Sequence, residues 1–218
     1  MSNTFSAQDV KILDSIIESR RTVRSFKAEV PQDSMITAIV HTGIYAPYAA
    51  IAIGDNIDFG RFFVFRKGSQ NLALMNQMVK EAAKTSLNHI EKETQSRPDL
   101  TEKLAKYIQM LSSVSQMGLP GILEIPCIIV VAERRGIPSV ENQSLAHVMQ
   151  NMWLKATSLG LGFQLLTVVE NLTENQEFSK LLKLPYGEFA FNGCIIGYAA
   201  QEPAPRKTMS ADRVITWL

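Results

Sequence analysis

The sequence is poor in the residue types that bind metals or form disulfide frameworks. It contains two cysteines, Cys127 and Cys194, and each lies in an apolar run without a partner at metal-ligand spacing. Its three histidines, His41, His89 and His147, are isolated from one another along the chain. We therefore expect no metal site, and we expect both cysteines to be buried as small apolar residues of a reduced, cytoplasmic protein.

The sequence also lacks net charge, long apolar runs and the common motifs of nucleophilic catalysis. A formal net charge of +1 argues against a protein that coats nucleic acid or a membrane with a whole basic face. No apolar run approaches the roughly 20 residues of a membrane helix, and the first residues lack the pattern of a secretory signal. No serine lies in a Gly-x-Ser-x-Gly turn. We expect any enzyme of this composition to take its reactivity from an organic cofactor, with no nucleic-acid or membrane partner.

What the sequence does contain is the patterning of a single domain over residues 1–218. Hydrophobic residues make up 46% of the chain, which is enough for a sizeable core. Apolar spacing and capping residues predict helices over 8–19, 32–45, 69–92, 98–117 and 141–160. They predict strands over 61–65, 125–133 and 188–200 and an extended segment over 161–170. A short helix through Leu182 is expected to open with a capping box at Thr173–Gln176. Strands separated by helices predict an α+β or α/β fold with one sheet between helical layers.

Four cations lie close together at the end of the first predicted helix, at Arg20, Arg21, Arg24 and Lys27. Guanidinium groups match phosphate oxygens two at a time, and Thr22 can add a hydroxyl donor. The alternative is a solvated basic turn that complements the C-terminal dipole of the helix. A second cationic pair, Arg206 and Lys207, follows the sequence EPAP and can converge with the first group on one phosphate. From the residues alone, both interpretations stay open.

Several motifs in a fixed order resemble one protein family. The residues SRRTVRSF resemble the opening Arg-Arg-Ser/Thr-x-Arg-x-Phe motif of the FMN-dependent nitroreductase family. GIYAP, MQNMWLKATSLGLGFQLLTV and LLKLPYGEFAFNGCIIGYAAQEPAPRK resemble later motifs of the same family. The resemblance covers about the first 65 residues and residues 125–218, and residues of about 68–120 correspond to the family's variable helical region.

The resemblance implies a fold, an assembly and a chemistry. The family fold is an α-β-α sandwich of the α+β class, in which a mixed sheet is flanked by helices. Two chains form an intertwined homodimer, and a C-terminal tail, here about residues 200–218, extends across the partner. FMN at the dimer interface passes a hydride from NADH or NADPH to a small-molecule acceptor such as a nitroaromatic or a quinone. The implied enzyme is an NAD(P)H-dependent flavin oxidoreductase in which no side chain is catalytic, because FMN carries the chemistry.

The resemblance also implies roles for particular residues. Arg20 and Arg206 correspond to the cations on the FMN phosphate, and Arg24 corresponds to the cation near the pyrimidine edge of the flavin ring. Leu166 to Val168 fall where the family lays backbone against the ring, and Asn56 corresponds to a residue that reaches the flavin of the neighbouring subunit. The complete set of implied FMN-binding residues is Arg20, Arg21, Thr22, Arg24, Asn56, Leu166, Thr167, Val168, Arg206 and Lys207.

Two segments depart from the family pattern. Tyr48, Asp58 and the pair Phe59-Gly60 stand where the family has Ser, Gln and Pro-Trp, and Thr167-Val168 replaces a Gly-Gly pair near the flavin. The altered loop of residues 48–60 favours one alternative, a flavin-binding or flavin-consuming relative without general NAD(P)H reductase activity. The cluster Arg20–Arg24 leaves an alternative of another class, an anion-binding or nucleic-acid-binding protein.

Overall fold

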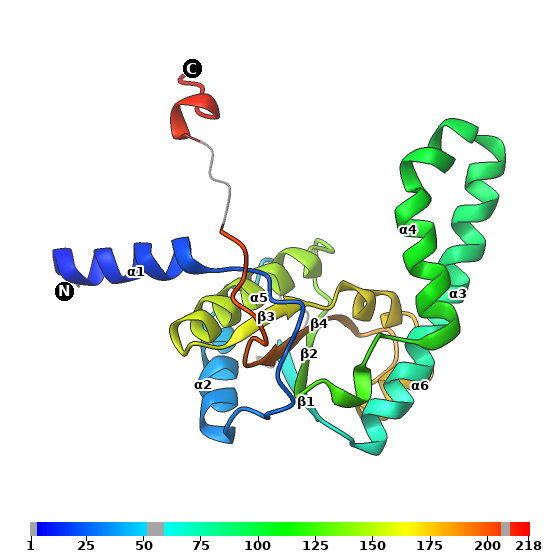
Figure 1. The fold of residues 1–218 in the computed structure, drawn as a ribbon, viewed down its shortest axis with the longest axis horizontal. Helices are drawn as coiled ribbons and strands as arrows, with labels where there is room; N and C mark the ends of the chain where they lie inside the picture. Colours follow the sequence, from blue (N-terminus) through cyan, green and yellow to red (C-terminus); the bar gives the residue numbers. More distant parts are fainter. Residues whose placement is uncertain (1–3, 52–58, 206–209) are drawn as a thin grey trace.

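The computed structural model of the protein describes residues 4–51, 59–205 and 210–218. Figure 1 shows the elements in chain order, which are α1 (Ala7–Ser19), α2 (Asp33–Ile44), β1 (Gly60–Arg66), α3 (Gln70–Ser96), α4 (Pro98–Met117), η1 (Ile122–Glu124), β2 (Cys127–Arg134), α5 (Glu141–Ser158), β3 (Gly162–Leu165), η2 (Thr167–Leu172), α6 (Gln176–Leu181), β4 (Phe189–Gly197) and η3 (Ala211–Arg213). The helices and strands expected from apolar spacing are therefore present, with ends that shift by a few residues. The class is α+β, as predicted.

The sheet has four strands in the order β1-β2-β4-β3, and all three pairings are antiparallel. The expectation of a mixed sheet is therefore wrong for these strands, and the parallel contact among the described residues is a single bridge between Thr22 and Phe163. The reason lies in the connection between β1 and β2. Arg66, the last residue of β1, pairs with Cys127, the first of β2, so the chain returns to the end of the sheet that it left. An antiparallel pair results, because a parallel pair needs a crossover to the other end.

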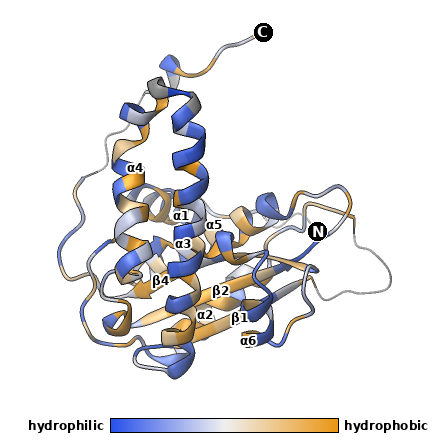
Figure 2. Ribbon diagram, turned by 90° about the vertical axis from the view of Figure 1, so that its right-hand side faces the viewer, coloured by the Kyte–Doolittle hydropathy of each residue, from blue (hydrophilic) through white to orange (hydrophobic). Residues whose placement is uncertain are grey.

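Helices cover both faces of this sheet, so the expected layered sandwich is confirmed. Alternate side chains of a strand point to opposite faces, and β2 supplies residues to two separate cores. One core, with α3, α4 and α6, takes Ile128, Val130 and Ala132. The other core, with α2 and α5, takes Cys127, Ile129 and Val131. Figure 2 shows the strands mostly in hydrophobic colours, as expected for a sheet buried on both sides.

Both cysteines are free and buried, as the sequence predicted. Burial raises the pKa of Cys127 to about 12 and that of Cys194 well above its ordinary value. Because the thiolate is the reactive form of cysteine, neither residue is suited to act as a nucleophile.

Two local expectations around the third strand are wrong. The extended segment does not continue to residue 170, because the strand ladder ends at Leu165 and the chain enters η2 at Thr167. The short helix is capped by Asn175, whose side chain accepts a hydrogen bond of 2.9 Å from the backbone N–H of Phe178. The Thr173 hydroxyl instead accepts a hydrogen bond from the backbone N–H of Phe191 on β4, so it binds a strand and does not cap the helix.

The two ends of the chain extend away from the layered body (Figure 1). Helix α1 begins with a reciprocal capping box between Ser6 and Asp9, yet none of its residues is buried. The last residues carry exposed apolar side chains, and Trp217 has 90% of its surface accessible. Most of the apolar surface of α1 and of the last residues is therefore uncovered within one copy of the chain, although α1 contacts α5.

Candidate functional site

The cationic residues found in the sequence lie on one segment along the outer edge of the sheet. We call residues 20–27 the arginine segment. It follows α1 and runs beside β3, where the backbone N–H of Val23 donates to the carbonyl of Phe163 at 3.0 Å. Further along, the N–H of Lys27 donates to the carbonyl of Tyr198 at 2.8 Å. Both halves of the segment are thus tied to the sheet by backbone hydrogen bonds.

A close approach between the segment and β3 explains one glycine. A Cβ atom added at Gly162 would lie 2.8 Å from the side chain of Val23. A larger residue at this position would push the arginine segment away from the strand. Gly160, two residues earlier, has a φ of +72° and ends helix α5, as the sequence predicted.

Trp153 of α5 holds the first two arginines. The guanidinium carbon of Arg20 lies 4.3 Å from the centre of the indole ring, which is a cation–π contact. The indole Nε1–H donates to the carbonyl of Arg21 at 3.1 Å. The indole ring is itself held in place, because it stacks on the ring of Phe163 with 4.9 Å between the ring centres. No sequence motif pointed to Trp153, although the N–H of a buried tryptophan usually needs an acceptor.

The structure divides the arginines between the two interpretations left open by the sequence. The guanidinium of Arg21 donates to the carbonyls of Glu18 and Arg20, so it completes the C-terminal end of α1. Arg24 is exposed and forms no hydrogen bond or ion pair with another described residue. The helix-end interpretation therefore fits Arg21 and does not account for Arg24.

The other predicted flavin-binding residues in the described chain follow the same strand. Leu166 is buried, and its N–H donates to the carbonyl of Gly193 at 2.7 Å. Thr167 is exposed at the start of η2, and Val168 is half-buried against the core. Phe163, which pairs with Thr22, precedes Leu166 by three residues, or about 10 Å of extended strand. The structure thus brings Arg20–Arg24 and Leu166–Val168 to one edge of the sheet.

Three predicted residues, Asn56, Arg206 and Lys207, lie outside the described residues. The described part of the tail does return to the arginine segment. Glu202 to Pro205 line a hollow of about 670 Å³ together with Ser19 and Arg21. Residues 202–205 of the tail therefore lie beside the end of α1.

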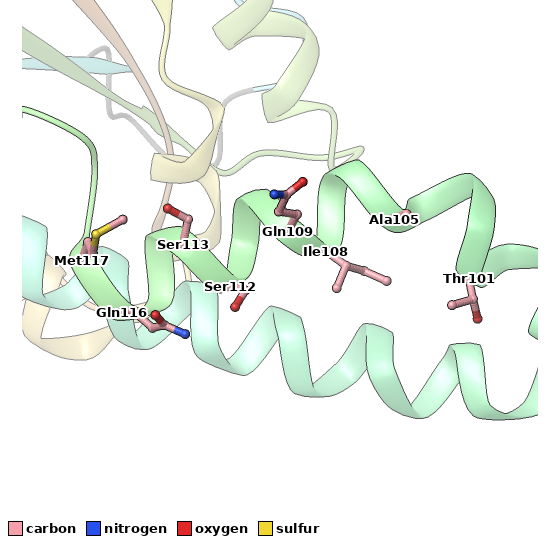
Figure 3. Close-up of a pocket in the computed structure, with 8 residues that line it drawn as sticks. All are labelled: Thr101, Ala105, Ile108, Gln109, Ser112, Ser113, Gln116 and Met117. Carbon is pink, nitrogen blue, oxygen red and sulfur yellow. The ribbon is translucent and has the colours of Figure 1, made fainter.

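A second hollow lies on the helical hairpin and has a different character. Figure 3 shows the side chains of α4 that line it, from Thr101 at one end to Met117 at the other. None of these residues is charged, and Figure 1 places the hairpin on the side of the molecule opposite α1. We assign no chemistry to it.

Among the residues that the structure describes, no group of three or more His, Cys, Asp or Glu side chains is arranged to hold a metal ion. In the same part of the chain, every helix is too short or too polar to span a lipid bilayer.

The structure defines a layered α+β protein with a cationic segment along its outer strand. The comparisons with known proteins make this class specific. The sequence model of the Nitroreductase family matches residues 17–198, a range that includes the whole arginine segment. The chain belongs to the nitroreductase family.

Solved structures of similar fold extend over nearly the whole chain. A Bacteroides fragilis nitroreductase with bound FMN superposes with a TM-score of 0.68 at 18% identity, covering 94% of this chain and 98% of that one. A BluB-like flavoprotein from Clostridium difficile superposes with a TM-score of 0.66 at 18% identity, covering 94% of this chain and 98% of that one. An iodotyrosine deiodinase bound to FMN and 3-iodo-L-tyrosine superposes with a TM-score of 0.62 at 20% identity, covering 91% of this chain and 95% of that one. At these identities the similarity concerns the fold. No curated protein matches the chain in sequence.

Proposed function

We propose that the protein is an FMN-dependent oxidoreductase that uses NADH or NADPH to reduce a nitroaromatic, a quinone or a related small acceptor. The observation that carries this proposal is the placement of Arg20, Thr22 and Arg24 on one segment beside β3, in a chain of the nitroreductase family. Members of similar fold were solved with FMN bound, which supports the choice of cofactor.

The donor groups of the described residues fit FMN. Guanidinium groups bind phosphate through paired, charge-assisted hydrogen bonds, and the contact with Trp153 holds Arg20 in place for this role. Arg24 is exposed and supplies a cation for the pyrimidine edge of the flavin ring. The backbone of Leu166 to Val168 would flank the ring. Asn56, Arg206 and Lys207 complete the proposed set.

Bound FMN would supply hydride chemistry, taking a hydride from the nicotinamide and releasing reducing equivalents to the acceptor. The chain contributes binding and orientation. Arg20 and Thr22 would hold the phosphate, Arg24 would favour negative charge on the ring, and the rigid strand β3 would fix the distance between these contacts. We assign no acid–base residue, because the cofactor carries the reactive atoms.

We further propose that the protein acts as a single flavin-binding domain in a homodimer. Val10, Leu13 and Ile17 form the apolar side of α1, and each is at least 40% exposed. Leu13 and Ile16 also line a hollow of about 320 Å³ with Leu154 of α5. A contiguous apolar surface of this kind is typical of an interface. A second copy would cover it, and the tail of about residues 200–218 would extend across that copy.

The dimer has a direct test. Light scattering should give the mass of two chains for the parent protein and of one chain for a Leu13→Glu, Ile17→Glu variant. A matched control, Lys11→Glu, adds a negative charge to the same helix without changing an apolar residue and should stay dimeric. A parent protein that is monomeric at all concentrations would refute the assembly.

The function is tested by the absorbance spectrum of the purified protein before and after NADH or NADPH is added without oxygen. A flavin spectrum that bleaches supports the proposal. A protein that binds no added FMN contradicts it.

A second candidate is a flavin-binding relative without general reductase activity. The replacement of Gly-Gly by Thr167-Val168 favours it, because side chains now flank the backbone that approaches the ring. The similar folds of a deiodinase and a BluB-like flavoprotein add support. A flavin spectrum that NADH and NADPH both leave unchanged would select this candidate.

A further inference from the structure

Among the described residues, Glu133 stands out as a buried residue whose carboxylate has no hydrogen-bond or ion-pair partner. Glu133 lies at the end of β2 with 4% of its surface exposed. The next residue, Arg134, points to the other face of the sheet, where it pairs with Glu188 at 2.5 Å. Burial alone raises the pKa of Glu133 to about 7. A buried, unpaired carboxylate is costly, so its presence needs an explanation.

The carboxylate lines a cavity of about 340 Å³ between the end of α2, the start of β1 and α5. A Cβ atom added at Gly60 would lie 3.5 Å from its Oε2 atom, so a side chain at this position would contact the carboxylate. The remaining lining residues are apolar or aromatic and include Ile44, Ala46, Tyr48, Phe59, Phe62 and Val148. This volume lies within the range of small-molecule sites.

The aromatic walls of the cavity are held in place by backbone contacts. The rings of Tyr48 and Phe59 stack at 4.5 Å with an angle of 19°. The Tyr48 hydroxyl donates to the carbonyl of Arg134 at 2.9 Å, and the carbonyl of Phe59 accepts from the N–H of Arg134 at 2.7 Å. On the other side, Phe62 packs so closely on Gly43 that an added Cβ would lie 2.9 Å from the ring. The aromatic residues that line the cavity are thus held in position by contacts within the chain.

From this geometry we propose that the cavity is a binding site for a small organic cation with N–H donors on a flat or apolar body. Glu133 would accept the hydrogen bonds of an ammonium or amidinium group, and the rings of Tyr48, Phe59 and Phe62 would enclose the body of the ligand. The cavity lies at the β1 side of the sheet, whereas the arginine segment lies at β3, the opposite edge. The proposal therefore does not rest on the proposed function.

The chemistry of the cavity selects a cation over other ligands. An anion would meet the charge of Glu133 in a medium of low dielectric and would be repelled. A neutral apolar ligand would leave the carboxylate unpaired. A cation gains a charge-assisted hydrogen bond and removes the cost of the buried charge.

The probe for the test is benzamidine, which is cationic, with benzamide as a neutral compound of nearly the same shape. Calorimetric titration of the full chain at about pH 8, where Glu133 is ionised, should detect benzamidine and give binding weaker by about tenfold or more for benzamide. Glu133→Gln should weaken benzamidine binding by about tenfold to a hundredfold, because a carboxylate acceptor is lost. The control Glu188→Gln removes the exposed carboxylate that pairs with Arg134 and should leave the affinity unchanged.

A second variant tests the cavity without changing its charge. Ala46 lines the cavity, so Ala46→Phe would fill part of its volume while Glu133 stays in place. This variant should abolish benzamidine binding in a protein whose circular dichroism matches the parent. Equal affinity for the two compounds would overturn the proposal. So would benzamidine binding that survives in Glu133→Gln or in Ala46→Phe.

Discussion

The charged groups near the two edges of the sheet, at β3 and at β1, have opposite environments. At the β3 edge, Arg20 rests on the face of Trp153, and the segment that carries it is tied to β3 by backbone hydrogen bonds. At the β1 side, Glu133 is buried in a cavity with no partner among the described residues. The cations are oriented by protein groups and remain partly accessible, whereas the Glu133 carboxylate faces a cavity and has no partner among the described residues. A folded chain can therefore prepare one site by anchoring a charge and another by leaving a charge unpaired.

The largest effect should come from breaking the anchor of the cationic edge. Phe163 is fully buried, stacks on Trp153 and pairs with the arginine segment. Phe163→Ala should lower the free energy of unfolding by about 3–5 kcal/mol, as large-to-small core changes do. Phe59→Ala, at the half-buried ring on the β1 side, should cost only about 1 kcal/mol. Urea unfolding of both variants would measure the difference, and equal losses would mean that the two sides are anchored alike.

The cost of the unpaired carboxylate should appear as a dependence of stability on pH. The pKa of Glu133 rises from an ordinary 4.5 to about 7 in the folded protein, so folding favours the protonated form. Below pH 4.5, Glu133 is protonated in both the folded and the unfolded protein. As the pH rises from 4.5 to about 7, the unfolded chain ionises first, so the folded state loses stability relative to the unfolded state. Glu133→Gln should therefore stabilise the protein at about pH 8, by on the order of 3 kcal/mol at most, and change little at about pH 4. A stability difference that is the same at both values would contradict the burial of an unpaired carboxylate.

The cationic edge should be sensitive to loss of its first arginine. Arg20→Ala should weaken FMN binding by about 1.5–3 kcal/mol, the value of charge-assisted hydrogen bonds to a phosphate. Arg66 is a matched control, because it lies at the β1 side in an exposed ion pair with Asp33. Arg66→Ala should leave FMN affinity unchanged. Fluorescence titration of FMN measures both variants, and unchanged affinity in Arg20→Ala would remove this residue from the phosphate site.

The smallest effect should come from one hydrogen bond of Trp153. Trp153→Phe keeps an aromatic face against Phe163 and Arg20 but loses the bond from Nε1 to the carbonyl of Arg21. We expect a loss of about 1 kcal/mol in the free energy of unfolding. FMN affinity should fall less than in Arg20→Ala. Chemical denaturation and the same titration check this ranking, which fails if Trp153→Phe proves the more damaging change for FMN.

Much of the fold could be read from the sequence because local patterns and tertiary contacts agree there. The strand predicted over 125–133 is present as β2, and its residues divide between two cores. The helix predicted over 141–160 is α5, and the chain leaves it at Gly160, whose positive φ suits glycine. The local errors occur where a long-range contact decides. Thr173 has the residue type of a helix cap, but its hydroxyl accepts from Phe191 on β4.

The candidate sites divide in the same way. The arginine segment is visible in the sequence because its residues are adjacent and match a family motif. Trp153 was missed because its role depends on a contact with residues more than 130 positions away. Glu133 was missed because its neighbours in the sequence, Ala132 and Arg134, say nothing of the cavity that α2, β1 and α5 build around it.

By itself, the sequence determined the helices and strands, the burial of both cysteines and the cationic segment that leads to the nitroreductase family. These properties depend on the periodicity of apolar residues and on short motifs, which are local. Only the tertiary structure decided that the strands pair antiparallel, that Arg21 completes a helix end while Arg24 stays exposed, and that a carboxylate lies unpaired in an aromatic cavity. These properties depend on which distant residues come into contact, because partners supplied across the fold determine whether a charge is solvated, paired or left alone.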